Sequence, residues 1–320
     1  MKRLAVAIAV LLCAVRMAWP ETWAEKLGWQ KGDRVLIIHS DDVGMCHSTN
    51  LGAIAALEKG VVSSISIMMP CPWVGEIADY LKTHPEVDAG LHLALTSEWD
   101  YYRWAPVAGK CAVPGLADAQ GCLWDNVALV QQHASPDEIE TEIRAQIDRA
   151  IAFGIKPTHL DSHMGTLFSS PAYFQRFLKV AVDKQIPLLM IDLSPEKIAE
   201  EAPTLAPLLK AAVKAVWDAG FPMLDDIITD TYDWPADQKK ANYIKTLREL
   251  KPGLTEMIVH CAKRTEDFIS ITPAADRWIA DGECMLDPEI KKVLEDEKII
   301  LTTWRELKAR RDGVGSGRGK

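Results

Sequence analysis

The chain has 320 residues, 48% of them hydrophobic, and a formal net charge of −9. This length exceeds that of a minimal domain and suits one large barrel or doubly wound domain. An acidic chain without a basic stripe is a poor candidate for binding nucleic acid or an anionic membrane, so neither partner is expected.

The first residues have the pattern of an export signal. Two basic residues precede an apolar run over residues 4–15, which is too short to span a bilayer comfortably. Thr22 and Ala24 occupy the −3 and −1 positions of a cleavage site. We therefore expect residues 1–24 to be a signal peptide and the mature chain to be exported, periplasmic or extracellular. An uncleaved anchor is the alternative.

Apolar runs then alternate with amphipathic helical patterns along the chain. Strands are predicted at residues 35–39, 61–69, 87–95, 158–161, 187–191, 223–228, 254–259 and 299–302. Helices are predicted at residues 48–59, 74–81, 136–153, 173–183, 198–217, 236–250, 274–281 and 287–296. This alternation predicts an α/β fold with a parallel sheet and outer helices. The number of units favours a TIM-like (β/α) barrel of seven or eight strands over an open sheet.

No linker divides the chain after the signal, so residues 25–307 are expected to form a single barrel domain. The basic cluster that begins at Lys308 runs into a glycine-rich end, which predicts a disordered tail over residues 308–320. Cys111 and Cys122 are the most plausible local disulfide in an exported protein, although the sequence leaves open whether they pair.

Residues 96–130 interrupt the β–α alternation and form a predicted aromatic insertion. Exposed aromatic rings suit stacking against sugar faces. We expect such a platform at the barrel mouth, with an arginine that contacts hydroxyl or carboxylate groups, formed by Trp99, Tyr101, Tyr102, Arg103 and Trp104. The alternative is that these side chains are core beneath a long loop.

Two adjacent carboxylates, Asp41 and Asp42, follow the first predicted strand. Neighbouring acids repel each other and must be solvated, paired or bound to a cation. Because successive side chains of a regular strand point to opposite faces, both acids can serve one site only if the strand has ended and the backbone turns, as Gly44 permits. A surface turn with an N-cap for the next helix is the alternative.

Three histidines lie at or near the ends of later strands: His92, His163 and His260. In parallel barrels the reactive residues lie at the carboxyl ends of the strands. A carboxylate with imidazoles is the ligand set of a catalytic zinc or similar divalent ion with open coordination positions. Such an ion lowers the pKa of water and polarises a carbonyl, and hydrolysis then needs a base and an acid.

Three ordered motifs resemble those of the YdjC-like carbohydrate deacetylases, which remove acetyl groups from N-acetylated sugars such as chitooligosaccharides. The motifs are Ser40-Asp41-Asp42-Val43-Gly44, Gly90-Leu91-His92-Leu93 and Pro157-Thr158-His159-Leu160-Asp161-Ser162-His163. The resemblance implies a (β/α) barrel related to polysaccharide deacetylases.

The resemblance also implies roles for individual residues. It implies one divalent metal ion, Zn²⁺ or Mg²⁺, held by Asp42, His92 and His163. Asp41 would be the general base. His260 resembles a late histidine that acts as the acid and steadies the tetrahedral intermediate.

The chain departs from the family after His163, where the family continues with further histidines and this chain has residues 164–168, Met-Gly-Thr-Leu-Phe. The chain therefore resembles a divergent member. His159 and Asp161 are expected to support the ligands, because metal-binding histidines need carboxylate or carbonyl partners. His39, like three other histidines, is expected to make only local or solvent contacts.

The sequence therefore predicts a metal-dependent hydrolase that removes an acetyl group from an N-acetylated sugar or oligosaccharide, with an O-acetylated one as the alternative. A phosphoester hydrolase and a non-catalytic sugar-binding barrel are the rival functions. A homodimer is left open.

Overall fold

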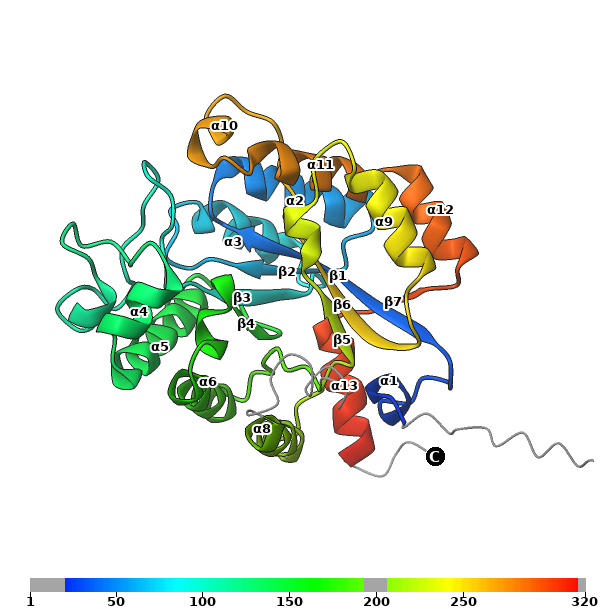
Figure 1. Ribbon diagram of the computed structural model, residues 1–320, viewed down its shortest axis with the longest axis horizontal. Coiled ribbons are helices and arrows are strands. Elements are labelled where there is room, and N and C mark those ends of the chain that lie inside the picture. Colours follow the sequence, from blue (N-terminus) through cyan, green and yellow to red (C-terminus); the bar gives the residue numbers. More distant parts are fainter. Residues whose placement is uncertain (1–20, 193–205, 316–320) are drawn as a thin grey trace, which may run out of the picture.

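The computed structural model describes residues 21–192 and 206–315. In this part of the chain seven parallel strands form one curled sheet, in the order β4-β3-β2-β1-β6-β5, with β7 paired to the start of β1 (Figure 1). The strands are β1 (Arg34–Val43), β2 (Ser64–Ile67), β3 (Ala89–Leu93), β4 (Leu160–Ser162), β5 (Asp226–Ile228), β6 (Gly253–Val259) and β7 (Ile300–Leu301).

The gap between β4 and β5 is spanned by a segment that forms isolated bridges only. Leu188 pairs in parallel with Leu160 at the start of β4, and Ile191 pairs with Leu224 just before β5. The strand expected at residues 187–191 is therefore reduced to these bridges. They join the two ends of the sheet, and the predicted (β/α) barrel is confirmed.

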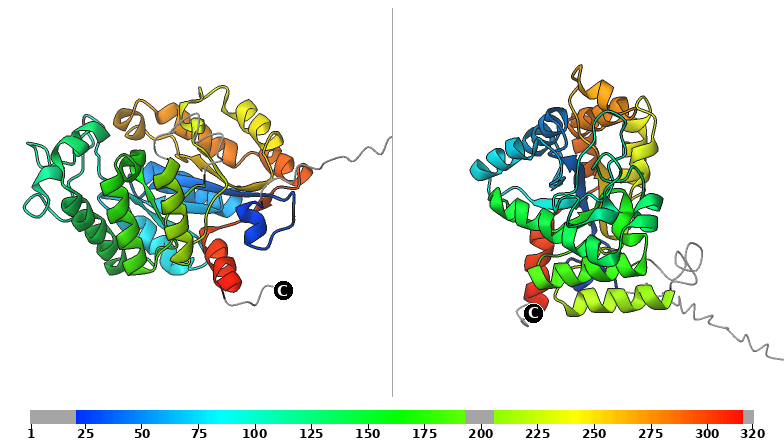
Figure 2. Two further views of the ribbon diagram at one scale, coloured as in Figure 1. Left: turned by 60° about the horizontal axis from the view of Figure 1, so that its bottom comes forward. Right: turned by 90° about the vertical axis from the view of Figure 1, so that its left-hand side faces the viewer.

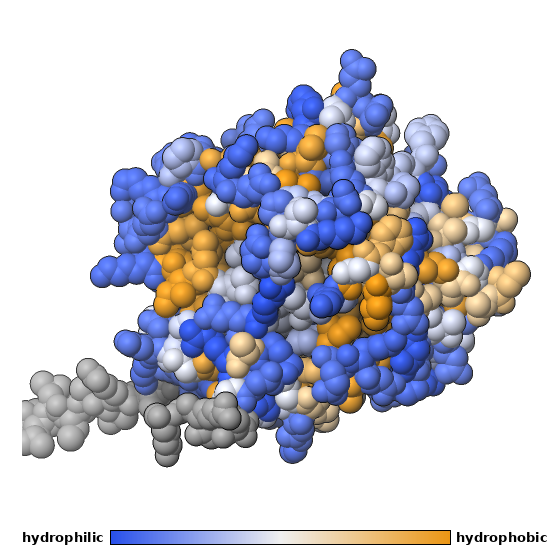
Figure 3. All heavy atoms as spheres, turned by 180° about the vertical axis from the view of Figure 1, so that it is seen from behind, coloured by the Kyte–Doolittle hydropathy of each residue, from blue (hydrophilic) through white to orange (hydrophobic). Residues whose placement is uncertain are grey.

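Helices cover the outside of the sheet (Figures 1 and 2). The longer ones are α2 (His47–Lys59), α3 (Val74–Thr83), α5 (Pro136–Ala152), α6 (Pro171–Lys184), α8 (Ala206–Asp218), α9 (Lys239–Arg248), α11 (Ala275–Met285), α12 (Pro288–Asp296) and α13 (Trp304–Gly315). Shorter ones are α1 (Trp23–Lys26), α4 (Val127–His133), α10 (Phe268–Ile271) and the 3₁₀ helices η1 (Pro114–Leu116), η2 (His163–Phe168) and η4 (Asp230–Asp233). The first part of the helix expected at 198–217 lies outside the described residues. Seen from behind, hydrophilic side chains cover most of the surface and apolar ones gather between them (Figure 3).

The side chains of β1 alternate between the inside of the barrel and the layer between sheet and helices. Val35 and Ile37 belong to a small apolar cluster within the barrel. Leu36 and Ile38 belong to the main core between sheet and helices. Since side chains alternate along a strand, the residues that follow on the inner face are His39 and Asp41.

Helices α1 and α13 close the end of the barrel at which the strands begin (Figure 1). Leu27, Trp304 and Leu307 pack in the same cluster as Val35 and Ile37. The prediction of a disordered tail is therefore wrong for residues 308–315, because the open end of the barrel needs an apolar cover and α13 supplies it.

The basic side chains of α13 stack on aromatic rings. The guanidinium of Arg310 lies 3.9 Å from the centre of the Trp29 ring, and that of Arg311 lies 3.6 Å from the centre of the Trp217 ring. Cation–π contacts of this kind hold the helix in place. Residues 316–320 lie outside the described part.

The first residues of the described chain belong to the fold. Trp23 and Ala24 are buried, and the backbone N–H of Trp23 donates to Asp225. Thr22 and Glu25 form a capping box around α1. Cleavage after Ala24, the site predicted from the sequence, would split this helix. None of the helices in the described ranges combines the length and apolarity needed to cross a membrane.

Candidate metal centre

A bulge in β1 brings both adjacent carboxylates to one site. Between Ser40 and Val43, β1 has one residue more than the paired segment of β2. Within this bulge Asp42 adopts a left-handed conformation with φ of 59°, which aspartate tolerates better than most residues. The sequence suggested that the strand ends before the two acids, but β1 continues through both of them. Its irregularity turns Asp42 toward the site that Asp41 faces.

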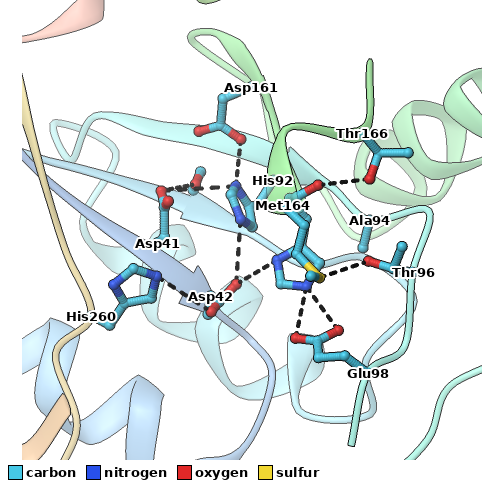
Figure 4. A network of polar contacts seen from close by, with 12 residues as sticks. Asp41, Asp42, His92, Ala94, Thr96, Glu98, Asp161, Met164, Thr166 and His260 are labelled. Carbon is cyan, nitrogen blue, oxygen red and sulfur yellow. Dashed lines mark hydrogen bonds and ion pairs between the residues drawn. The ribbon is translucent and has the colours of Figure 1, made fainter. Parts of the chain in front are cut away.

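Asp42 lies among three imidazoles at the carboxyl ends of the strands. Its Oδ1 is 3.4 Å from Nε2 of His92 and 3.2 Å from Nδ1 of His163. Its Oδ2 is 3.7 Å from Nε2 of His260 (Figure 4). β1, β3, β4 and β6 each lead into one of these residues, so residues far apart in the sequence converge at one rim.

Asp42, His92 and His163 fit a metal ion. Ligand atoms at the usual zinc distances lie about 3.3 Å apart in a tetrahedral site, and the distances from Asp42 Oδ1 to His92 and His163 match this spacing. One donor atom from each residue lies within 4.8 Å of the other two. Oδ1 of Asp42 is buried and accepts no hydrogen bond. A buried carboxylate oxygen without a donor calls for a cation.

The protonation of these ligands reflects their neighbours. Burial would raise the pKa of Asp42, but the charges of His163, His92 and His260 hold it well below its usual range. Burial would lower the pKa of His92, but Asp41 and Asp161 raise it to about 8. The pKa of His163 is raised against the effect of burial by Glu98 and Asp42. The pocket therefore attracts positive charge, and a divalent ion would bind by displacing protons.

Two carboxylates orient the ligand histidines from behind. Nδ1 of His92 lies 2.7 Å from Oδ1 of Asp161. Nε2 of His163 lies 3.0 Å from Oε1 of Glu98. Each contact leaves the opposite ring nitrogen directed at Asp42, as in carboxylate–histidine–metal arrangements. Asp161 thus contacts His92 on the ring nitrogen opposite the one that faces Asp42. No sequence motif marks Glu98, because it lies in the insertion at residues 96–130.

A buried polar layer lies beneath these residues. His39, expected to make only local contacts, is buried 3.2 Å from both Asp41 and Asp161. His159 is also buried, with its Nε2 3.8 Å from Oδ2 of Asp161 and its ring stacked on Trp304. His159 thus belongs to this buried layer and does not line the cavity beside Asp42.

His260 lies at the edge of the site, directly after β6. Its ring packs against Trp278 and Tyr232, with ring centres 4.9 and 5.1 Å away. Its backbone N–H donates to the buried carboxylate of Asp281. Burial lowers the pKa of His260, which makes its protonated form a stronger proton donor.

The site forms the floor of a cavity of about 480 Å³. Its walls are largely apolar and include Met164, Phe168, Ile227, Tyr232 and Trp278. The segment after His163 thus contributes Met164 and Phe168 to an apolar wall of the cavity.

The predicted aromatic platform is not part of this cavity. Trp99 and Trp104 are buried in the core, with 7% and 4% of their surfaces exposed. Arg103 binds Asp118 and the backbone of Leu123 within the insertion. Tyr102 donates to the backbone of Met45, and Tyr101 is 92% exposed. The platform prediction is therefore wrong for Trp99 and Trp104, because both pack into the main core together with residues of the barrel.

Cys111 and Cys122 are both free thiols. The predicted local disulfide is not formed. Polar contacts made by Asp118 organise this loop instead, since its side chain accepts from the backbone N–H groups of Gln120 and Cys122.

The profile of one protein family, described as YdjC-like protein, matches residues 35–296. A carbohydrate deacetylase of Thermus thermophilus is 30% identical over 89% of this chain and 97% of its own length. A carbohydrate deacetylase of Geobacillus stearothermophilus is 36% identical over 86% of this chain and 98% of its own.

The fold also matches a solved structure. The structure of a candidate cellobiose-phosphate cleavage protein from Enterococcus faecalis superposes with a TM-score of 0.72 at 22% identity, over 86% of this chain and 99% of that one. This likeness supports the barrel fold and carries no statement about activity.

Proposed function

The chain belongs to the family of YdjC-like proteins, and on that basis we propose that it is a metal-dependent carbohydrate deacetylase that hydrolyses the amide of an N-acetylated sugar. The observation that carries the proposal is the convergence of Asp42, His92 and His163 at the floor of a cavity, beside Asp41 and His260. The names of the two curated relatives support the reaction type.

Asp42, His92 and His163 would hold the ion, and zinc suits their nitrogen and oxygen donors. When bound, the ion would supply the Lewis acidity that activates water and polarises an acetyl carbonyl.

Asp41 is placed to accept the proton of the attacking water. It lines the cavity, and Ser66 donates to its Oδ1 at 3.1 Å. Its neighbour Asp42 faces the three imidazoles, so of the two adjacent acids we assign the role of base to Asp41. On the other side His260 protonates the departing amine, because its ring lies at the cavity wall beyond Asp42.

The cavity lining argues for an uncharged acyl substrate over a phosphoester. Among the described residues that line it, the charged side chains other than histidine are acids: Asp41, Asp42, Glu98, Asp161 and Glu256. A site for a phosphoryl group would be expected to include arginine or lysine. The apolar wall suits the acetyl methyl group and the apolar face of a sugar ring.

Acetate release from a panel of N-acetylated and O-acetylated sugars, after reconstitution with zinc, tests the proposal. Elemental analysis of the same sample gives the metal content. We expect one zinc per chain and acetate release that a chelator abolishes. Asp42→Ala should lose bound metal and orders of magnitude in rate while it remains folded. Full activity and metal content in this variant would refute the assignment.

We also propose that the protein is exported. The apolar run at residues 4–15 and its basic flank support this. N-terminal sequencing of protein from the periplasm or medium should find a first residue at or before Thr22, and recovery of only the uncut chain from the cytoplasm would contradict export.

A further inference from the structure

His39 lies between two carboxylates that serve different parts of the site. Its Nε2 is 3.2 Å from Oδ1 of Asp41 and 3.2 Å from Oδ2 of Asp161. Asp41 is the proposed base, and Asp161 orients the ligand His92 through its other oxygen. One ring nitrogen thus touches the residues that govern both proton transfer and metal binding.

The ring of His39 is enclosed on all sides. Its side chain has no exposed surface. The ring of His159 meets it edge-on at 5.0 Å, and His159 in turn stacks on Trp304. Gly90 leaves the space for His159, because a Cβ at this position would lie 2.4 Å from the His159 ring. His39 therefore has little freedom to turn away from the two acids.

The charges around His39 require a positive group at this position. The carboxylates that face it are Asp41, Asp161 and Glu256, which come from three different strands. Burial would lower the pKa of His39, but these acids together raise it above its usual value. Without a cation here, Asp41 and Asp161 would repel each other in a buried space.

We propose that His39 is a positioning residue that binds Asp41 and Asp161 together, so that the base and the support of the metal ligand are held as one unit. The inference rests on the proposed function: its effect on metal affinity rests on the proposed metal centre alone, and its effect on rate rests on the proposed reaction as well. It reaches beyond the residues that the family motifs mark, since His39 lies outside all three.

A second metal ion is the competing explanation for this cluster. One ring nitrogen of His39, one of His159 and one oxygen of Asp161 also lie within 4.8 Å of one another. Nε2 of both histidines and Oδ2 of Asp161 are, like Oδ1 of Asp42, buried without a hydrogen-bond partner, but two features favour a proton over a metal ion. Neither histidine reaches the cavity wall, and the 3.8 Å between His159 and Asp161 exceeds the spacing of about 3.3 Å expected around zinc.

The test compares the substitutions His39→Leu and His39→Gln with the wild-type chain. Leucine removes the contact at similar volume, whereas glutamine keeps a neutral donor. His47→Leu is the matched control, because the ring of His47 is half exposed and bonds to Glu76 away from the site. The readouts are zinc content and affinity, the absorption spectrum of the Co²⁺-substituted protein, and separate kcat and KM values for acetate release.

His39→Leu should weaken metal binding by about 10-fold or more, the usual effect of disturbing residues behind a metal ligand. We expect kcat to fall by a similar or larger factor, KM to change little and the Co²⁺ spectrum to shift. His39→Gln should be intermediate, and it carries the test if the leucine variant does not fold. His47→Leu should match the wild type.

Unchanged metal affinity, spectrum and kcat in His39→Gln and His39→Leu would overturn the inference. So would two zinc ions per wild-type chain with one lost in His39→Leu, since that result would make His39 a ligand. If the wild type releases no acetate, the proposed function fails, while metal affinity and the Co²⁺ spectrum still decide the role of His39.

Discussion

Replacing Asp161 tests whether the carboxylate behind His92 sets the affinity of the metal centre. The Asp161–His92 contact is 2.7 Å long and both side chains are only 5% exposed. The carboxylate fixes the proton on Nδ1 and leaves the lone pair of Nε2 directed at Asp42. Loss of such a partner typically costs about 10- to 100-fold in metal affinity, which corresponds to about 1.4–2.7 kcal/mol.

The two substitutions at this position should differ in size. Asp161→Asn keeps an oxygen that can accept from Nδ1 and removes only the charge, so we expect a loss near 10-fold. Asp161→Leu removes the acceptor as well and should lose near 100-fold. Glu98→Gln removes the equivalent charge behind His163, but Glu98 is 19% exposed. Solvent screens it more, and its loss should be smaller than that of Asp161→Asn.

Competition of each variant with a chelating dye for zinc gives these affinities. Thermal unfolding of the metal-free proteins shows whether each variant is folded. Wild-type affinity in Asp161→Leu would refute the assigned role of this residue. A larger loss in Glu98→Gln than in Asp161→Leu would mean that the site is organised around the other histidine.

Further predictions concern the floor of the barrel and the insertion. Burial raises the pKa of Glu256 to about 7. Because an acid with a raised folded-state pKa binds extra protons in the fold, the contribution of Glu256 to the stability of the metal-free wild type should fall as pH rises from about 4.5 to 7. In denaturant titrations of the chelator-treated proteins, the free energy of unfolding of Glu256→Gln relative to that of the wild type should rise by up to about 3 kcal/mol over this pH range. A stability difference that does not depend on pH would contradict the raised pKa of Glu256. Gly90→Ala should lower the free energy of unfolding by about 1–3 kcal/mol, because the added Cβ would press on the buried His159 ring, and wild-type stability would show that the ring can move. Tyr101→Ala should retain activity and lie within about 0.5 kcal/mol of wild-type stability. Trp99→Ala should lower the free energy of unfolding by about 3–5 kcal/mol. A large rise in KM for Tyr101→Ala would show that Tyr101 contacts the sugar after all.

The alternation of strand and helix patterns predicted the barrel correctly, because each element has its own local period. The helix at Pro136 illustrates this: its capping box of Ser135 and Glu138 is present as expected. The same local patterns failed where elements gain stability only from distant partners. The segment at 187–191 forms isolated bridges, and the basic end of the chain becomes helical on aromatic rings from other parts of the sequence.

The sequence by itself determined which residue types stand at the carboxyl ends of the strands, and the resemblance of its three motifs to a known family implied Asp42, His92 and His163 as a set. Only the tertiary structure decided how they meet. The bulge that turns Asp42, the carboxylate of Glu98 behind His163 and the enclosure of His39 all depend on contacts between distant residues. The physical reason is that motifs record local chemistry, whereas burial and charge pairing depend on which segments the closed barrel brings together.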